Sequence, residues 1–161
     1  MRCFLLICAF ALLPASAASA MPVEGKVGYG EWAARFGNFR RGHVHAGQDV
    51  FARPGTFLHA IRDAVVVEVG EGDGRGNHIA LYSAAERETY VYFHMLHPSF
   101  RRVGDRVAAG DRVGRLGCTG SCDGPHLHFE VRRGRGSYGN PRNPLPLLRS
   151  LQTASAQGVA D

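Results

Sequence analysis

Hydrophobic and polar residues alternate with a period of two in several short runs of this chain, and glycine-rich segments separate the runs. The runs are rich in Val, Ile, Tyr and Phe, the residue types that favour strands. They are AVVVEVG (64–70), HIALYSA (78–84), TYVYFHML (89–96), DRVGRLG (111–117) and HLHFEVRR (126–133). Twenty-one glycines and the lack of a sustained 3.6-residue periodicity argue against a helical architecture. The pattern predicts a mainly β fold, a single small antiparallel domain of sandwich or barrel type.

Two of these runs divide into an apolar and a polar face, because alternate residues of a strand face the same side. In the 126–131 run the polar face is expected to carry His126, His128 and Glu130, and the apolar face Leu127, Phe129 and Val131. In the 89–96 run we expect one face to carry Tyr90, Tyr92 and His94, and the other Val91, Phe93 and Met95. A buried histidine is costly unless it is hydrogen-bonded or bound to a ligand. The histidines of the two strands are therefore candidates for a common site.

The first twenty residues, MRCFLLICAFALLPASAASA, have the features of a secretory signal. One basic residue precedes an apolar run, and small residues up to Ala20 suggest cleavage after that position. A membrane anchor is the weaker interpretation, because the run falls below the roughly 18 apolar residues that span a bilayer. We expect an exported protein of the periplasm or cell envelope, or a secreted one, with no membrane insertion after cleavage.

The rest of the chain suits one domain with a moderate core. We expect a short leader at residues 21–35, the folded domain at 36–148 and a flexible tail at 149–161. From NPRNPLPLL (140–148) onward the prolines are expected to prevent regular structure. The formal net charge of +5 suits an anionic partner, but the arginines are scattered without the stacking aromatics of single-strand binders. We therefore expect no nucleic-acid partner.

Cysteines in the chain beyond the signal are limited to Cys118 and Cys122, within CTGSC. In an oxidising compartment such a pair is expected to form a disulfide. The closed loop is very small, so its contribution to stability should be at the low end of disulfide values. A reduced pair that binds a metal stays open as an alternative.

The segment HVHAGQDV (43–50) adds a second group of candidate ligands. His45 and Asp49 are four residues apart, and Gly47 allows a tight bend between them. Imidazole and carboxylate are ordinary ligands of Zn²⁺, and one histidine of the HLH run would complete three protein ligands. The fourth position would stay open for water, as in catalytic zinc sites, and the remaining histidines would be free for proton transfer.

The segments HAGQD, YFHML and GPHLHFEV occur in this order, and GDRVAAGDRVGRLGCTG precedes the third. Together they resemble the LytM/lysostaphin-type zinc metallopeptidases of family M23, which carry H-x(3)-D, an isolated histidine after an aromatic strand, and H-x-H. The resemblance extends from about residue 36 to about residue 144. It implies a groove that holds one Zn²⁺ per chain.

The resemblance also assigns roles to single residues. It implies that His45, Asp49 and His128 hold the zinc, and that His94 and His126 are the catalytic histidines. These would activate the metal-bound water or stabilise the oxyanion during hydrolysis of a peptide bond. The implied substrates are the peptide crosslinks, and thus the stem peptides, of bacterial peptidoglycan. A regulatory or targeting protein is a possible further partner.

Several residues depart from the family pattern or allow a second role. Gln48 replaces a usual aliphatic residue, and we expect no more than altered packing from it. His43 has the same strand parity as His45, but the H-x-G-x-D context favours His45. Glu130 is either a general base or, as the favoured interpretation, a structural partner of another side chain. Four residues are assigned to surface or packing positions: His59, His78, His97 and Tyr92.

Three other functions use the same residues. A closed structural zinc site would combine Cys118 and Cys122 with the two histidines of the HLH run, but it leaves His45 and Asp49 unexplained. A cysteine peptidase would need a free thiol as nucleophile, which a disulfide removes. The main alternative is a non-catalytic peptidoglycan-binding or amidase-activating module of the same fold. The complete set of five site residues favours catalysis.

Overall fold

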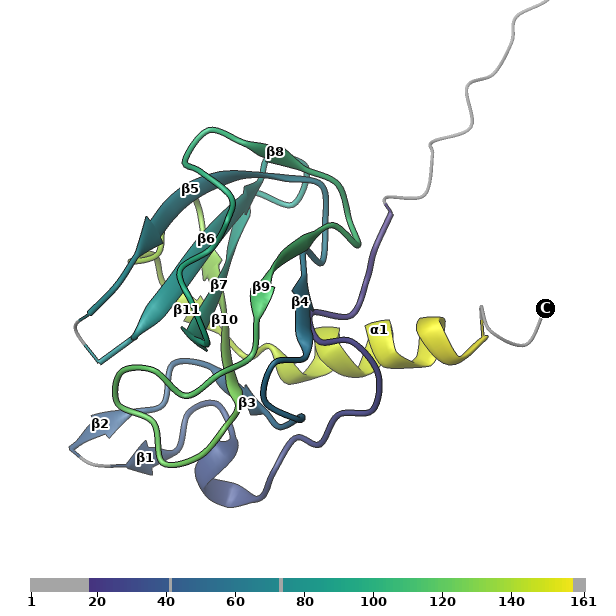
Figure 1. Ribbon diagram of the computed structural model, residues 1–161. Helices are drawn as coiled ribbons and strands as arrows, with labels where there is room; N and C mark the ends of the chain where they lie inside the picture. The colour runs from purple at the N-terminus through teal and green to yellow at the C-terminus, as the bar shows by residue number, and fades with distance from the viewer. Residues whose placement is uncertain (1–17, 41, 73, 158–161) are drawn as a thin grey trace, which may run out of the picture.

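The computed structural model describes residues 18–40, 42–72 and 74–157 (Figure 1). A short 3-10 helix, η1 (Trp32–Ala34), precedes the first strand. The strands are β1 (Phe39–Arg40), β2 (His43–Val44), β3 (Gln48–Val50), β4 (Phe57–His59), β5 (Ala64–Gly70), β6 (Asn77–Ser83), β7 (Glu88–Met95), β8 (Arg106–Val107), β9 (Arg112–Arg115), β10 (Leu127–Arg133) and β11 (Pro141–Arg142). Helix α1 (Leu145–Gln157) follows the last strand. The fold is mainly β, as the alternation of residues predicted.

The largest sheet is antiparallel and runs in the order β11-β10-β7-β6-β5-β8. Strand β3 pairs with the beginning of β10, while β11 pairs with its end. Two small antiparallel sheets, β1-β2 and β4-β9, complete the fold, and the sheets do not close into a barrel (Figure 1). This arrangement places β3, β10 and the end of β7 next to one another.

The main core lies between the large sheet and the β4-β9 pair. Leu58 of β4 and Val113 of β9 pack in the same buried cluster as Tyr92 and Phe129 of the large sheet. The rings of Tyr92 and Phe129 meet edge to face with centroids 5.2 Å apart. The apolar residues of β10 all belong to this cluster: Leu127, Phe129 and Val131. The predicted division of β10 into two faces is confirmed.

The predicted faces of β7 are only partly correct. Tyr92 belongs to the main core, whereas His94 does not share its face. Phe93 lies directly opposite His128 in the register, and the two rings stack with centroids 5.2 Å apart. His94 has a left-handed φ of 60°, which interrupts the strand alternation. As a result Met95 returns to the core, and the imidazole of His94 lies beside Phe93 and His128.

The predicted lack of regular structure after the proline-rich segment is wrong for residues 145–157, which form α1. Pro146 lies in the first turn, where its missing N–H has no intrahelical partner to lose. Leu148 and Leu151, one turn apart, are buried against the main core. Helix α1 is therefore held by its apolar face. Residues 158–161 of the predicted tail lie outside the described residues.

The predicted leader, residues 21–35, packs along the domain. Val23 is fully buried and pairs with Leu58 of β4, and Gly28 pairs with Phe51 just after β3. Most of the predicted export signal, residues 1–17, lies outside the described residues. Among the residues that the structure describes, none of the helices is long and apolar enough to cross a membrane.

Candidate metal centre and active-site groove

Three candidate ligand atoms converge at the start of β10. The register places Asp49 of β3 directly opposite His128 of β10, and the turn before β3 brings in His45. His45 Nε2 lies 2.9 Å from His128 Nδ1 and 3.1 Å from Asp49 Oδ1, and His128 Nδ1 lies 3.1 Å from Asp49 Oδ1. All three residues are buried. Gly47 permits this approach, because a Cβ there would lie 2.6 Å from the carbonyl oxygen of Phe129.

The hydrogen bonds of the two imidazoles show which atoms carry lone pairs. His45 Nδ1 donates to the backbone oxygen of Arg35 over 2.9 Å, which leaves Nε2 as an acceptor. His128 Nε2 donates to Glu130 Oε1 over 3.1 Å, which leaves Nδ1 as an acceptor. Together with Asp49 Oδ1, three acceptor atoms face one another at hydrogen-bonding distance. Such a group suits a cation, and its nitrogen and carboxylate donors are ordinary ligands of Zn²⁺.

Charge in the site favours metal binding. Burial acts to raise the pKa of Asp49, but the nearby His128 and His45, when they carry a proton toward it, and Arg40 outweigh burial and hold this pKa well below its usual range. Burial acts to lower the pKa of His128, but hydrogen bonds to Asp49 and Glu130 raise it. A metal ion and a proton therefore compete for His128 Nδ1, next to a carboxylate that stays ionised.

Each of these ligands is oriented by a further contact. Arg40 of β1 donates to Asp49 Oδ2 over 2.7 Å and to the backbone oxygen of Ala33 over 3.0 Å, and its contact with Asp49 Oδ1 is longer, at 3.5 Å. Glu130 holds His128 through one oxygen and accepts from Arg132 Nε over 2.7 Å through the other. Because both oxygens of Glu130 are engaged, the contacts support a structural role for this residue. The sequence pattern did not reveal Arg40.

Two further histidines lie beside the three ligands. His94 and His126 have ring centroids 4.8 Å apart, and His126 Nε2 lies 3.6 Å from Asp49 Oδ1. The Nδ1 atom of His94 donates to the backbone oxygen of Thr119 over 2.8 Å, and that of His126 to the backbone oxygen of Gly124 over 2.7 Å. Both Nε2 atoms are therefore acceptors. His126 Nε2 is buried and has no hydrogen-bond partner in the described part of the protein.

Both histidines are neutral near pH 7. Burial lowers the pKa of His94 to about 4, and it also lowers the pKa of His126. A neutral imidazole with a free Nε2 can accept a proton from a reacting group. The two residues are thus suited to act as bases next to a bound metal.

Four of the five residues, Asp49, His94, His126 and His128, line a cavity of about 690 Å³, and His45 is buried behind them. Its lining includes Val44 and Phe51, which are 59% and 40% exposed, and the charged residues Arg40 and Arg75. The β1-β2 hairpin and η1 form one side, and residues 121–126 form another. The candidate metal site therefore lies in a groove with apolar walls and side chains of both charges, large enough for a peptide segment.

Comparison with known proteins identifies the family of this fold and site. The model of peptidase family M23 matches residues 43–144, which include all five site residues. The chain belongs to peptidase family M23. The resemblance of its three motifs to this family is thereby confirmed.

Individual M23 relatives cover most of the domain. The glycyl-glycine endopeptidase ALE-1 of Staphylococcus capitis is 37% identical over 112 residues, which are 68% of this chain and 30% of that protein. The peptidoglycan DD-endopeptidase ShyC of Vibrio cholerae is 36% identical over 111 residues, 67% of this chain and 24% of that protein. This chain thus spans less than a third of the length of these relatives.

The fold agrees with a solved M23 structure. The catalytic domain of the antimicrobial peptidase lysostaphin from Staphylococcus simulans superposes with a TM-score of 0.65 at 34% identity. The match covers 77% of this chain and 92% of that domain. The mainly β fold predicted from the alternation of residues is therefore the fold of an M23 catalytic domain.

The remaining histidines that the M23 pattern leaves unassigned lie outside the group of ligand atoms. His43 is exposed on β2. His78 is satisfied by the backbone oxygen of Gly76 and by Glu68, and His97 is exposed. His59 precedes the loop between β4 and β5 and is half-buried. The positions of His59, His78 and His97 agree with their assignment to the surface or to packing, whereas His43 lines the groove.

The structure also tests the expectations for Tyr92, for the two cysteines and for Gln48. Tyr92 is buried and donates its hydroxyl to the backbone oxygen of His59, so it does not face the groove. Cys118 and Cys122 form a disulfide, which removes the ligands of the alternative structural zinc site and the nucleophile of a cysteine peptidase. Gln48 does more than alter packing, because its Nε2 donates to the backbone oxygens of Tyr29 and Ala34.

Proposed function

We propose that this chain is an exported zinc metalloendopeptidase that hydrolyses peptide crosslinks of bacterial peptidoglycan. One observation carries the proposal. Three side-chain atoms that can bind a metal, one each from His45, Asp49 and His128, converge beside two neutral histidines at the wall of a groove. His45, Asp49 and His128 would hold one Zn²⁺, which suits their donor chemistry. Membership of family M23 and the peptidoglycan substrate in the name of the relative ShyC support the choice of substrate.

The bound metal would supply Lewis-acid polarisation of the peptide carbonyl and activation of water. His126 Nε2 faces Asp49 Oδ1 over 3.6 Å, so it is placed to accept a proton at the metal site. His94, whose ring adjoins that of His126, would have to take up a proton at Nε2 from water in the site before it acts as a donor. The resulting imidazolium could donate a hydrogen bond to the developing oxyanion and then pass the same proton to the leaving amine. The hydrogen bonds at both Nδ1 atoms keep the Nε2 atoms directed to the reacting groups.

Export and the division of the chain belong to the same proposal. Residues 1–20 would be removed as a signal, and residues 36–148 would form the peptidase domain in the periplasm, cell envelope or medium. Segment 21–35 would line the domain, since Ala33 and Ala34 border the groove. A regulatory or targeting protein would act from outside this domain.

A digestion of purified peptidoglycan tests the proposal. The released muropeptides are identified by mass spectrometry for the wild type, for His45→Ala, which removes a ligand, and for His97→Ala, which removes an exposed histidine. We expect conversion of crosslinked dimers to monomers by the wild type and by His97→Ala, and none by His45→Ala with retained circular dichroism. Equal digestion by His45→Ala would contradict the assignment. Zinc binding without any digestion would favour the non-catalytic module.

A further inference from the structure

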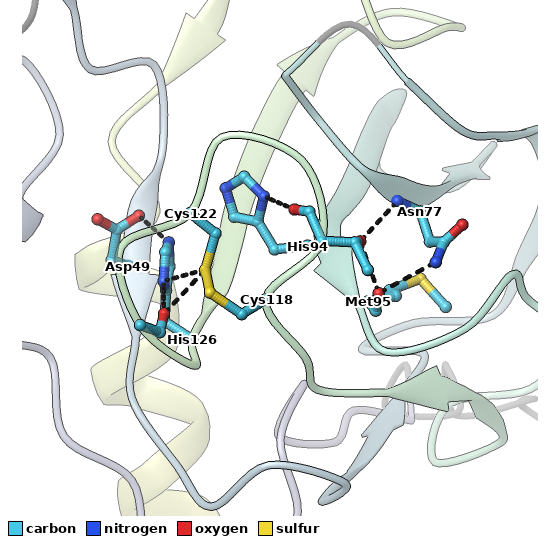
Figure 2. Close-up of a disulfide and its surroundings, with 9 residues drawn as sticks. Asp49, Asn77, His94, Met95, Cys118, Cys122 and His126 are labelled. Atoms are coloured by element: carbon cyan, nitrogen blue, oxygen red, sulfur yellow. Dashed lines mark hydrogen bonds and ion pairs between the residues drawn. A yellow bond between two sulfur atoms is a disulfide. The ribbon is translucent and has the colours of Figure 1, made fainter.

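One loop, residues 118–124, holds both histidines that the proposed function makes catalytic. The backbone oxygen of Thr119 accepts from His94 Nδ1 over 2.8 Å, and that of Gly124 accepts from His126 Nδ1 over 2.7 Å. The loop begins with a disulfide between Cys118 and Cys122, and Figure 2 shows both histidines beside it. His94 in β7 and His126 just before β10 thus depend on one short, cross-linked segment.

These two hydrogen bonds determine which nitrogen can react. A neutral imidazole exists as two tautomers, and a carbonyl partner at Nδ1 selects the form whose Nε2 carries the lone pair. Without the partner, the ring would be free to exchange tautomers and to rotate. His94 depends on its partner strongly, because its backbone has an unfavourable φ of 60° and only its surroundings keep it there.

The loop itself is fixed against the neighbouring backbone. The hydroxyl of Thr119 donates to the backbone oxygen of Met95 over 2.8 Å and accepts from the backbone N–H of Asn77 over 2.9 Å. Gly120 has a φ of +72°, and a Cβ there would lie 2.3 Å from the nitrogen of Gly76. In Figure 2 the contacts of Asn77 and Met95 lie on the same side of the loop as His94, opposite Asp49 and His126. The disulfide closes the segment that contains these contacts.

The metal ligands, in contrast, are held by other parts of the chain. His45 donates to Arg35, Asp49 accepts from Arg40, and His128 donates to Glu130. The contacts that orient the three ligands therefore come from residues 35–40 and from β10, and not from the disulfide loop. A substitution in the loop should therefore disturb the orientation of His94 and His126 and leave the affinity for the metal unchanged.

We propose that the loop of residues 118–124, of which the disulfide closes residues 118–122, is a positioning element for catalysis. It fixes both histidines with the proton on Nδ1, through the carbonyl of Thr119 inside the closed ring and that of Gly124 two residues beyond it. Cys118 and Cys122 are thus positioning residues that set turnover and leave metal binding unchanged. The inference rests on the proposed function for its effect on turnover, but the tautomers of the two histidines are a property of the fold alone.

The test replaces the disulfide in the double variant Cys118→Ala/Cys122→Ala. The wild-type protein with Zn²⁺ bound is expected to show Nδ1–H tautomers for His94 and His126 in long-range ¹H–¹⁵N correlation spectra, and the variant a mixture for both. Turnover on crosslinked muropeptides should fall about 100-fold, the effect of a misplacement near 1 Å. KM and the affinity for Zn²⁺ should not change.

Two further variants separate positioning from general loss of stability. Leu151→Ala removes a buried side chain of α1 and is the control for destabilisation, with unchanged tautomers and kcat expected at a temperature where it is folded. Thr119→Val removes the hydroxyl that fixes the loop but leaves the disulfide, and Thr119→Ser keeps the hydroxyl. We expect Thr119→Val to lower kcat and Thr119→Ser to restore it, which provides a test even if the double cysteine variant does not fold.

Single Nδ1–H tautomers in the double variant, with wild-type kcat, would overturn the inference. Loss of Zn²⁺ in parallel with kcat would also overturn it, because the loop would then support the metal site. A wild-type protein that does not cleave peptidoglycan would refute the proposed function only. The tautomers of His94 and His126 in the variants would still decide the inference.

Discussion

Replacement of Glu130 by Gln tests whether this buried carboxylate orients a metal ligand. Glu130 is 3% exposed, and its two oxygens accept from His128 Nε2 and from Arg132 Nε. Gln keeps an acceptor for His128 but loses the negative charge, and its amide would face the donor Arg132. Arg132 can turn to solvent and keep its bond to the backbone oxygen of Gly139, so the fold should survive.

Loss of a partner that orients a metal ligand costs about 10-fold to 100-fold in metal affinity. Because Glu130→Gln retains one hydrogen bond, we expect a loss of about 10-fold, or about 1.4 kcal/mol. Glu130→Ala retains neither bond and should approach 100-fold, or about 2.7 kcal/mol. For Glu130→Gln we expect the loss in free energy of Zn²⁺ binding to exceed the loss in free energy of unfolding of the metal-free domain.

Competition for Zn²⁺ against a chelator of known affinity, at one fixed pH, measures this loss. Glu88→Gln is the matched control, because Glu88 also binds an arginine through both oxygens, Arg142, but lies at the start of β7 away from the ligands. Zinc affinity of Glu130→Gln equal to that of the wild type, or a loss no larger than that of Glu88→Gln, would refute the reasoning.

Three other substitutions probe separate parts of the structure. Arg40→Met removes the donor to Asp49 Oδ2 and should weaken Zn²⁺ binding by about 10-fold in the same competition assay; unchanged or tighter binding would contradict the role of Arg40. Phe129→Ala empties a fully buried position in the main core and should lower the free energy of unfolding by about 3–5 kcal/mol in urea, so a loss below 1 kcal/mol would be inconsistent with the packing. Gly120→Ala would place a side chain at a φ of +72° and in a clash with Gly76. We expect it to lower the free energy of unfolding by about 1–3 kcal/mol, measured in urea. Wild-type stability in this variant would contradict the close contact between the loop and Gly76.

Strand β10, which begins inside the H-x-H motif, was predictable because its residues alternate between two faces. Leu127, Phe129 and Val131 fill the core, and the same parity places His128 and Glu130 on the other face. The candidate ligands His45, Asp49 and His128 could be named together only through the resemblance to family M23, and the structure brings these three residues together. Spacing alone placed His45 and Asp49 together and did not choose between the two histidines of the motif.

Other features depend on backbone conformation and on distant partners that residue types do not reveal. His94 leaves the face of Tyr92 because its φ is positive, and a strand pattern assumes extended φ throughout. The carbonyls of Thr119 and Gly124 hold catalytic candidates, yet every residue has a carbonyl. Pro146 was taken to prevent a helix, although its place in the first turn of α1 is one that proline tolerates.

The proposed function depends most directly on whether peptidoglycan is cleaved only when the metal is present. Purified peptidoglycan is digested by the protein as purified, by the protein after chelation, and by the chelated protein with Zn²⁺ restored, and the muropeptides are read by mass spectrometry. We predict that crosslinked dimers become monomers in the first and third reactions and persist in the second. Cleavage that survives complete removal of the metal would contradict a zinc endopeptidase built on His45, Asp49 and His128.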